Sequence, residues 1–186
     1  VRQHPVLPGL IALTAGAEIL GFSHQALLPS LARDVLQVGP EGLGVMSAAR
    51  LVGGILGLVF ISQLGQVRGN GPLFLAVLVF FGGSLVVLGL VPGFAWVLLL
   101  LVLVNALGAL SDILSQTLVQ LAVPVGLRGR AGGAWVLAVG LAPLGQLEIG
   151  ALASLLGVSS ALGVNGVGLM IVATAGAVLV PRLRRP

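Results

Sequence analysis

The sequence lacks cysteine, lysine and tyrosine, and it has few charged residues of any kind. Only 8% of its 186 residues are charged and 58% are hydrophobic, whereas a soluble domain carries about 25% charged residues. Without cysteine the chain forms no disulfide and offers no thiolate to a metal. A water-soluble fold of this size could not bury so much apolar surface. The composition therefore predicts a protein embedded in a lipid bilayer.

Motifs for enzymatic chemistry are also missing. The sequence has no phosphate-binding G-x-x-x-x-G-K-[ST] loop, no G-x-G-x-x-G fingerprint and no His or acidic residues at metal-ligand spacing. No Ser–His–acid arrangement can be found. Nine arginines give a net charge of +4, but they are scattered between apolar runs instead of forming one basic patch with aromatics. We therefore expect no enzyme, no cofactor, no metal site and no nucleic-acid partner.

Long apolar runs dominate what is present. A helix that crosses a bilayer needs about 20 mostly apolar residues, and turn signals separate six such runs. The sequence therefore predicts an all-α, polytopic membrane protein that forms a single bundle over residues 1–186. The predicted spans are approximately 7–28, 42–64, 72–90, 94–119, 131–156 and 161–180. Because Val1 is not an initiator methionine, we expect the chain to be part of a longer protein.

The arginines predict the orientation of the spans. Six spans place both termini on one side of the membrane, and arginine-rich loops stay in the cytoplasm. The side of the termini carries Arg2, Arg68, Arg128, Arg130, Arg182, Arg184 and Arg185. The other side has only Arg33, next to Asp34. We therefore expect a multi-pass protein of the inner or plasma membrane with both termini in the cytoplasm.

Polar side chains lie along one face of the first span and one face of the fourth. Such groups are costly in hydrocarbon and usually face a bundle interior or a water-filled cavity. The candidates for a substrate or proton pathway are Glu18, His24, Gln25, Asn105, Asp112 and Gln116. The alternative for each of these residues is a purely structural role in helix packing.

Charged groups in the spans suggest two further roles. Glu18 and Arg50 both fall near the middle of the bilayer at about 1.5 Å per residue, which makes them the candidate intramembrane ion pair. Glu18 and Asp112 are the candidate proton carriers, since a buried carboxylate can titrate near neutral pH. An ion pair that only fixes helix packing is the alternative for Arg50.

The polarity of the spans repeats after the third. The first and fourth spans are polar on one face, the second and fifth are intermediate and glycine-rich, and the third and sixth are almost purely apolar and look lipid-facing. This order is a weak signal of a three-plus-three internal repeat, which many transporters have.

The segment between the fourth and fifth spans carries a family resemblance. It reads "PVGLRGRAGGAW" (124–135), and with "GPEGLGVMSAARLVGGILG" (39–57) and "SDILSQTLVQLAVP" (111–124) it resembles the C-terminal half of a major facilitator superfamily transporter, in the drug-efflux and enterobactin-exporter-like branch. The resemblance covers essentially the whole chain. One departure is the loop "GQVRGNG" (65–71), which keeps Arg68 but lacks the aspartate of the family signature G-x-x-x-D-R-x-G-R-R.

The resemblance implies an exporter of small organic molecules, of the multidrug or siderophore type. The complete carrier would have twelve helices in two halves and work by alternating access, usually as a proton antiporter. The first and fourth spans would line its cavity. The second and fifth would meet the missing N-terminal half, which places Gln146 and Glu148 at the inter-half interface. Arg68, Arg128 and Arg130 would belong to cytoplasmic gate loops.

The glycines of the segment between the fourth and fifth spans have predicted roles. We expect Gly129 to turn the backbone between the two arginines, and Gly132 and Gly133 to bring the fifth span close to a neighbour.

The alternative to a transporter half is a standalone six-helix structural or regulatory membrane protein without transport of its own. Six further spans upstream of Val1 in the reading frame would separate these two hypotheses.

Overall fold

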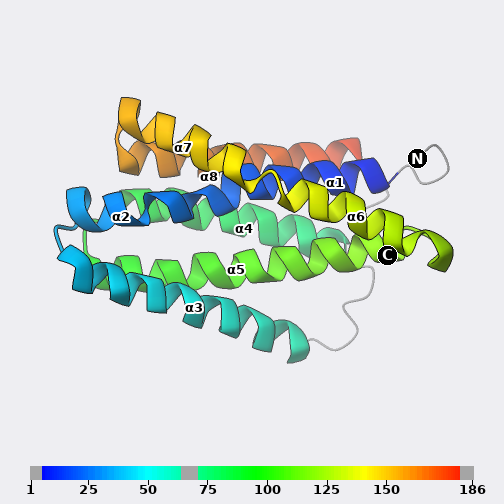
Figure 1. Ribbon diagram of the computed structural model, residues 1–186, viewed down its shortest axis with the longest axis horizontal. Helices are drawn as coiled ribbons and strands as arrows, with labels where there is room; N and C mark the ends of the chain where they lie inside the picture. Colours follow the sequence, from blue (N-terminus) through cyan, green and yellow to red (C-terminus); the bar gives the residue numbers. More distant parts are fainter. Residues whose placement is uncertain (1–5, 64–70, 181–186) are drawn as a thin grey trace.

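The protein is a bundle of long helices in a computed structural model that describes residues 6–63 and 71–180 (Figure 1). No strand occurs in these two ranges. Six helical segments are long and apolar enough to cross a membrane: Leu7–Val35, Gly39–Gln63, Gly71–Leu90, Phe94–Leu121, Val125–Leu156 and Val158–Leu179. The predicted all-α fold with six spans is therefore confirmed.

Some of these spans consist of one regular helix and others of several. They are α1 (Leu7–Gly16), α2 (Leu28–Ser30), α3 (Gly39–Gln63), α4 (Gly71–Leu90), α5 (Phe94–Leu121), α6 (Arg128–Val139), α7 (Ala142–Leu156) and α8 (Val158–Leu179). The second, third, fourth and sixth spans are single helices, whereas the first and fifth are interrupted.

The first span changes helix type along its length. After α1 the backbone forms a π-helical turn over Ala17–Gly21 and a 3-10 helix over Phe22–Leu27, and it continues through α2 to Val35. The predicted end at Leu28 is therefore wrong. Pro29 lies in the first turn of α2, where a missing N–H leaves no helical hydrogen bond unmade.

The fifth span is broken in its middle. The predicted span over 131–156 lies within Val125–Leu156, but it consists of two helices, because α6 ends at Val139 and α7 begins at Ala142. Pro143 lies in the first turn of α7 and has no N–H to continue the hydrogen-bond ladder from α6. After α7 the chain reverses at Gly157, whose φ of 85° favours glycine.

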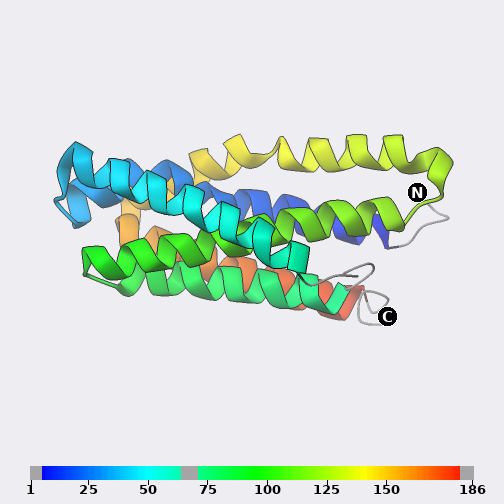
Figure 2. The same cartoon turned by 90° about the horizontal axis from the view of Figure 1, so that it is seen from below.

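The helices pack in a pattern that repeats after the third span. The second span, α3, packs along α5, and the fifth span, α6 with α7, packs correspondingly along the first. Helix α4 packs on α5 as α8 packs on the first span, and α4 and α8 pack on each other (Figures 1 and 2). This exchange of spans one to three for spans four to six is the predicted three-plus-three arrangement.

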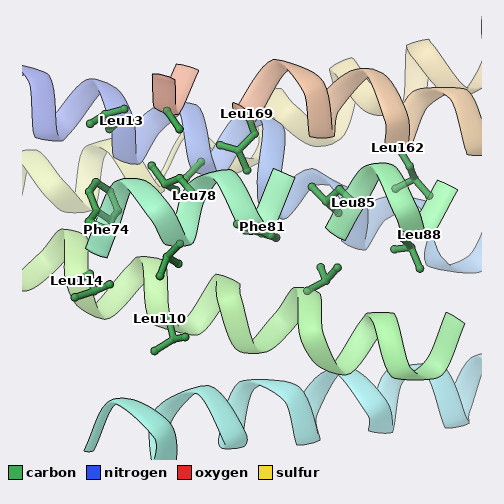
Figure 3. Packing of buried hydrophobic residues seen from close by; sticks show 14 of the residues in the cluster. Leu13, Phe74, Leu78, Phe81, Leu85, Leu88, Leu110, Leu114, Leu162 and Leu169 are labelled. Atoms are coloured by element: carbon green, nitrogen blue, oxygen red, sulfur yellow. The ribbon is translucent and has the colours of Figure 1, made fainter. Parts of the chain in front are cut away.

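Helix α4 supplies most of the large side chains of the core. Its residues Phe74, Leu78, Phe81, Leu85 and Leu88 are at most 1% exposed, and they lie among α1, α5 and α8 (Figure 3). The opposite face of α4 is open, with Phe80 68% exposed. The third span therefore buries one apolar face on its neighbours and presents the other outward.

Glycines set the closest helix contacts. A Cβ atom at Gly53 or Gly57 of α3 would overlap the backbone of α5 at Val102 or Ala106. In the other repeat, a Cβ at Gly145 would overlap the backbone of the first span at Ile19. Small residues of this kind let helix backbones approach closely in membranes, so these glycines hold the second span on the fourth and the fifth span on the first.

The second and fifth spans have the least cover. Only 17% of the most apolar window is buried in each of them, against 28–50% in the other four. Their exposed side chains are largely aliphatic, including Leu51 at 71% and Leu147 at 73% exposure. Such faces lie against lipid or against another membrane protein.

Candidate functional site

A hollow opens where the first, second and fourth spans meet. Its volume is about 350 Å³. Arg50 and Gly54 line it from α3, Asn105 and Asp112 line it from α5, and Phe22 lines it from the first span. Asn105 and Asp112 share one face of α5 because they are two helical turns apart. The structure thus gathers three of the candidate residues, Arg50, Asn105 and Asp112, around one space.

Arg50 has no ion-pair partner in the described ranges. Its guanidinium Nε is shielded from solvent and makes no hydrogen bond. The salt bridge within the described ranges joins Arg33 and Asp34 at the exposed end of the first span, with 2.7 Å between Arg33 Nε and Asp34 Oδ1. The predicted Glu18–Arg50 ion pair is not formed in this structure.

Glu18 lies outside the set of residues that line the hollow with Arg50. Glu18 lies on the π-helical turn of the first span and is 5% exposed. Its carboxyl is close enough to that of Asp112 on α5 for the two groups to interact electrostatically. The imidazole of His24 is close enough to interact in the same way with Arg50. The two candidate carboxylates therefore lie within electrostatic range of each other.

The remaining pathway candidates differ in their placement. Gln25 is half-buried, whereas Gln116 is exposed on α5, and neither lines the hollow. Asn105 donates from Nδ2 to the carbonyl of Leu101 at 2.9 Å, which leaves its amide oxygen as an acceptor. Of the amides in the predicted pathway, only Asn105 lines this space.

A second polar cluster joins the first, fifth and sixth spans. Asn165 of α8 donates from Nδ2 to Ser23 Oγ at 2.9 Å and to Glu148 Oε2 at 3.1 Å. Asn165 and Ser23 are fully buried. Glu148, which we predicted at the inter-half interface, is thus held from within the bundle, while Gln146 is exposed on α7. Ser23 was not among the predicted site residues. The sequence feature that could have indicated this cluster is Asn165, an isolated polar residue in an apolar span.

His24 lies beside this cluster without joining it by a hydrogen bond. Its Nδ1 donates to the carbonyl of Gly21 at 2.6 Å, and its Nε2 is buried with no partner in the described ranges. Its ring meets that of Phe81 edge-on, with 6.3 Å between centroids. The residue is 1% exposed, so it does not reach an open pathway.

Phe22 is a site residue that the sequence did not indicate. Its ring packs edge-on against Phe81 with centroids 5.5 Å apart, and a Cβ at Gly108 would come within 3.1 Å of it. The aromatic wall of the hollow is therefore held in place by the core behind it. An apolar residue next to a polar stripe carries no sequence signal of this role.

Two of the predicted gate residues follow the C-terminal end of α5 in the chain. Arg128 and Arg130 are exposed on the first turn of α6, and Arg68 lies outside the described residues. The expected turn at Gly129 is wrong, since this residue is helical. The expected close contact at Gly132 and Gly133 is also wrong, because a Cβ at either position would meet nothing within 4 Å.

Helix α6 is instead joined to α5 by a side-chain hydrogen bond. Trp135 donates from Nε1 to Ser115 Oγ at 3.0 Å, and Ser115 is 2% exposed. The contact to the neighbouring span is thus made two turns into α6, by an indole ring and not by glycines.

Comparison with known proteins adds to this picture. The enterobactin exporter EntS of Citrobacter koseri is 32% identical over 96% of this chain, and that of Escherichia coli O81 is 29% identical over the same share. The chain spans 43% of the length of these relatives. No solved structure matches the chain significantly.

A family model also matches most of the chain. The model described as "Transmembrane secretion effector" covers residues 12–185, which includes five whole spans and most of the first. With its six apolar helices and their repeated packing, the chain is a multi-pass membrane protein and belongs to the transmembrane secretion effector family of the major facilitator superfamily.

Proposed function

We propose that this chain is one half of a twelve-helix secondary exporter that moves a small organic molecule out of the cell by alternating access. The observation that carries the proposal is the hollow lined by Arg50, Asn105 and Asp112 within an apolar bundle. Polar groups at membrane depth are a sign of a substrate or ion pathway. The exporter relatives, of which this chain spans 43%, support the same function.

The missing half would cover the second and fifth spans. These two spans are the least buried, and they occupy corresponding places in the two repeats. A second bundle packed on both would enclose the hollow between the halves. Arginine-rich segments on the side of both termini support a cytoplasmic location for the termini.

Protons would drive export through Glu18 and Asp112. Their carboxyls lie within electrostatic range of each other, and a proton bound by either removes a negative charge from the bundle. Uptake and release of this proton on opposite sides of the membrane would couple the proton gradient to the change between the inward-facing and outward-facing states of the carrier.

The carboxylate mechanism is tested with Glu18→Gln and Asp112→Asn in the complete carrier. Substrate movement driven by a pH gradient is measured in inverted membrane vesicles. We expect each variant to lose most of this movement, because an amide cannot carry a proton. Glu41→Gln is the control, since Glu41 is an exposed carboxylate at the start of α3. Undiminished transport in both test variants would rule out these carboxylates as carriers.

The gate role of Arg128 and Arg130 makes a separate prediction. Changing both residues to lysine keeps the positive charge that orients the span, but it loses the planar, five-donor geometry of the guanidinium. We expect export to fall several-fold while the amount of inserted carrier stays the same. Unchanged export would show that the two residues serve orientation alone.

A further inference from the structure

Arg50 forms no ion pair in the described ranges, although Asp112 lines the same hollow. All five acidic residues of the sequence lie in the described ranges, and none of them forms an ion pair with Arg50 there. Its Nε is shielded from solvent and has no acceptor, so a ligand in the hollow would reach the guanidinium at its terminal nitrogens. Because an unpaired charge at membrane depth is costly, an anionic group on a bound molecule would stabilise the Arg50 guanidinium.

The walls around Arg50 indicate what else the ligand carries. From α3, Leu51 and Ile55 give an aliphatic surface. From the first span, Phe22 gives an aromatic one that Phe81 holds behind it. These groups suit a flat apolar body next to the acidic group. Asn105 offers an acceptor oxygen to a hydroxyl or amide donor on the same molecule, and Asp112 does so without repelling the anion when its carboxyl holds a proton.

The size of the hollow limits the group that it takes. An apolar cavity of about 150 Å³ holds benzene, so a hollow of about 350 Å³ accommodates a substituted ring or a pair of fused rings. The remainder of a larger substrate would extend out of the hollow toward the second half of the carrier.

We propose that the hollow between α3, α5 and the first span binds an aromatic organic anion, with its carboxylate or phenolate oxygen on the Arg50 guanidinium and its ring against Phe22. This inference rests on the proposed exporter function and names the class of its substrate. Arginine suits this role because its donors match a planar carboxylate with two parallel hydrogen bonds.

Gly54 allows the hollow to be filled without disturbing the fold. It lines the hollow, and a Cβ there would meet nothing within 4 Å. Gly44 lies on the same helix with equally open surroundings, but outside the hollow. Gly54→Leu and Gly44→Leu therefore form a matched pair that adds the same side chain to the same helix.

The test measures binding of 2-naphthoate and of its neutral analogue 2-naphthamide to the purified complete carrier by titration calorimetry. We expect the anion to bind about tenfold more tightly, the ratio that one charge-assisted hydrogen bond provides. Arg50→Gln should remove this preference, and Arg50→Lys should restore part of it. Gly54→Leu should weaken both ligands, whereas Gly44→Leu should change neither.

Transport by the same preparations separates the two proposals. A carrier that exports its substrate but binds anion and amide equally, or keeps its preference in Arg50→Gln, overturns the anion site and leaves the exporter function intact. Binding that is unchanged in Gly54→Leu also overturns it, since the ligand then lies elsewhere. A carrier that binds naphthoate through Arg50 but transports nothing supports the site and contradicts the exporter function.

Discussion

Replacing Gly53 and Gly57 together by alanine is expected to leave little folded protein. In both positions the added Cβ would overlap the backbone of α5, at Val102 and at Ala106. Backbone cannot rotate away as a side chain can, so α3 has to move outward along its whole contact with α5. We expect each substitution to cost about 3 kcal/mol, the upper end for overpacking. The pair would then remove a large share of the roughly 5–15 kcal/mol that keeps a domain folded.

The measurement is the thermal unfolding of the full-length protein in detergent, together with its yield as a monodisperse species. Gly54→Ala is the control, because it adds the same methyl group on the same helix where nothing lies within 4 Å. We expect its unfolding temperature to be unchanged or slightly raised, since alanine loses less backbone freedom than glycine on folding. Equal stability of the double variant and the control would contradict the close α3–α5 contact.

Asn165→Leu is expected to produce the second large loss of stability. The amide of Asn165 donates to both Ser23 Oγ and Glu148 Oε2. Ser23 keeps a weaker bond to the carbonyl of Leu20 at 3.3 Å, but the described structure gives the Glu148 carboxylate no other donor. A charged group left without its partner in an apolar setting costs about 3 kcal/mol, and we expect a loss of this size.

A reciprocal variant makes this prediction specific to the hydrogen bond. Adding Glu148→Met to Asn165→Leu removes the orphaned carboxylate as well, and replacing both partners by apolar groups can be nearly neutral. The double variant should therefore unfold at a higher temperature than Asn165→Leu alone. Thr174→Val serves as a control on the same helix, because its exposed hydroxyl donates only to carbonyls of α8. Additive losses in the double variant would show that the amide–carboxylate bond is not what stabilises this junction.

Both predictions concern contacts between spans. The sequence alone did not indicate which residues make these contacts. The glycine-rich character of the second and fifth spans suggested close packing. The sequence could not distinguish Gly53, which touches α5, from Gly54, which faces open space. Adjacent residues on a helix point about 100° apart, so the rotation of the helix decides which glycine makes the contact.

The charged residues show the same limit. Depth along the helix predicted Glu18 and Arg50 as partners, because the two lie at similar height in the membrane. In the structure Arg50 instead shares a hollow with Asn105 and Asp112, while Asp112 is the charged neighbour of Glu18. Height in the bilayer follows from the sequence, whereas the direction in which a side chain points depends on how each helix turns toward its neighbours.

The sequence by itself determined that this protein is a bundle of six membrane-crossing helices, and the polarity of the spans indicated a three-plus-three order. The reason is that a bilayer leaves a long apolar segment no alternative to a helix, since every backbone polar group must be satisfied within the segment. Tertiary structure alone decided that Arg50 forms no ion pair in the described ranges, that Phe22 lines the hollow and that Asn165 joins three spans. These are contacts between residues far apart in the chain, and they depend on helix rotation and on the irregular first span, which apolar run lengths do not encode.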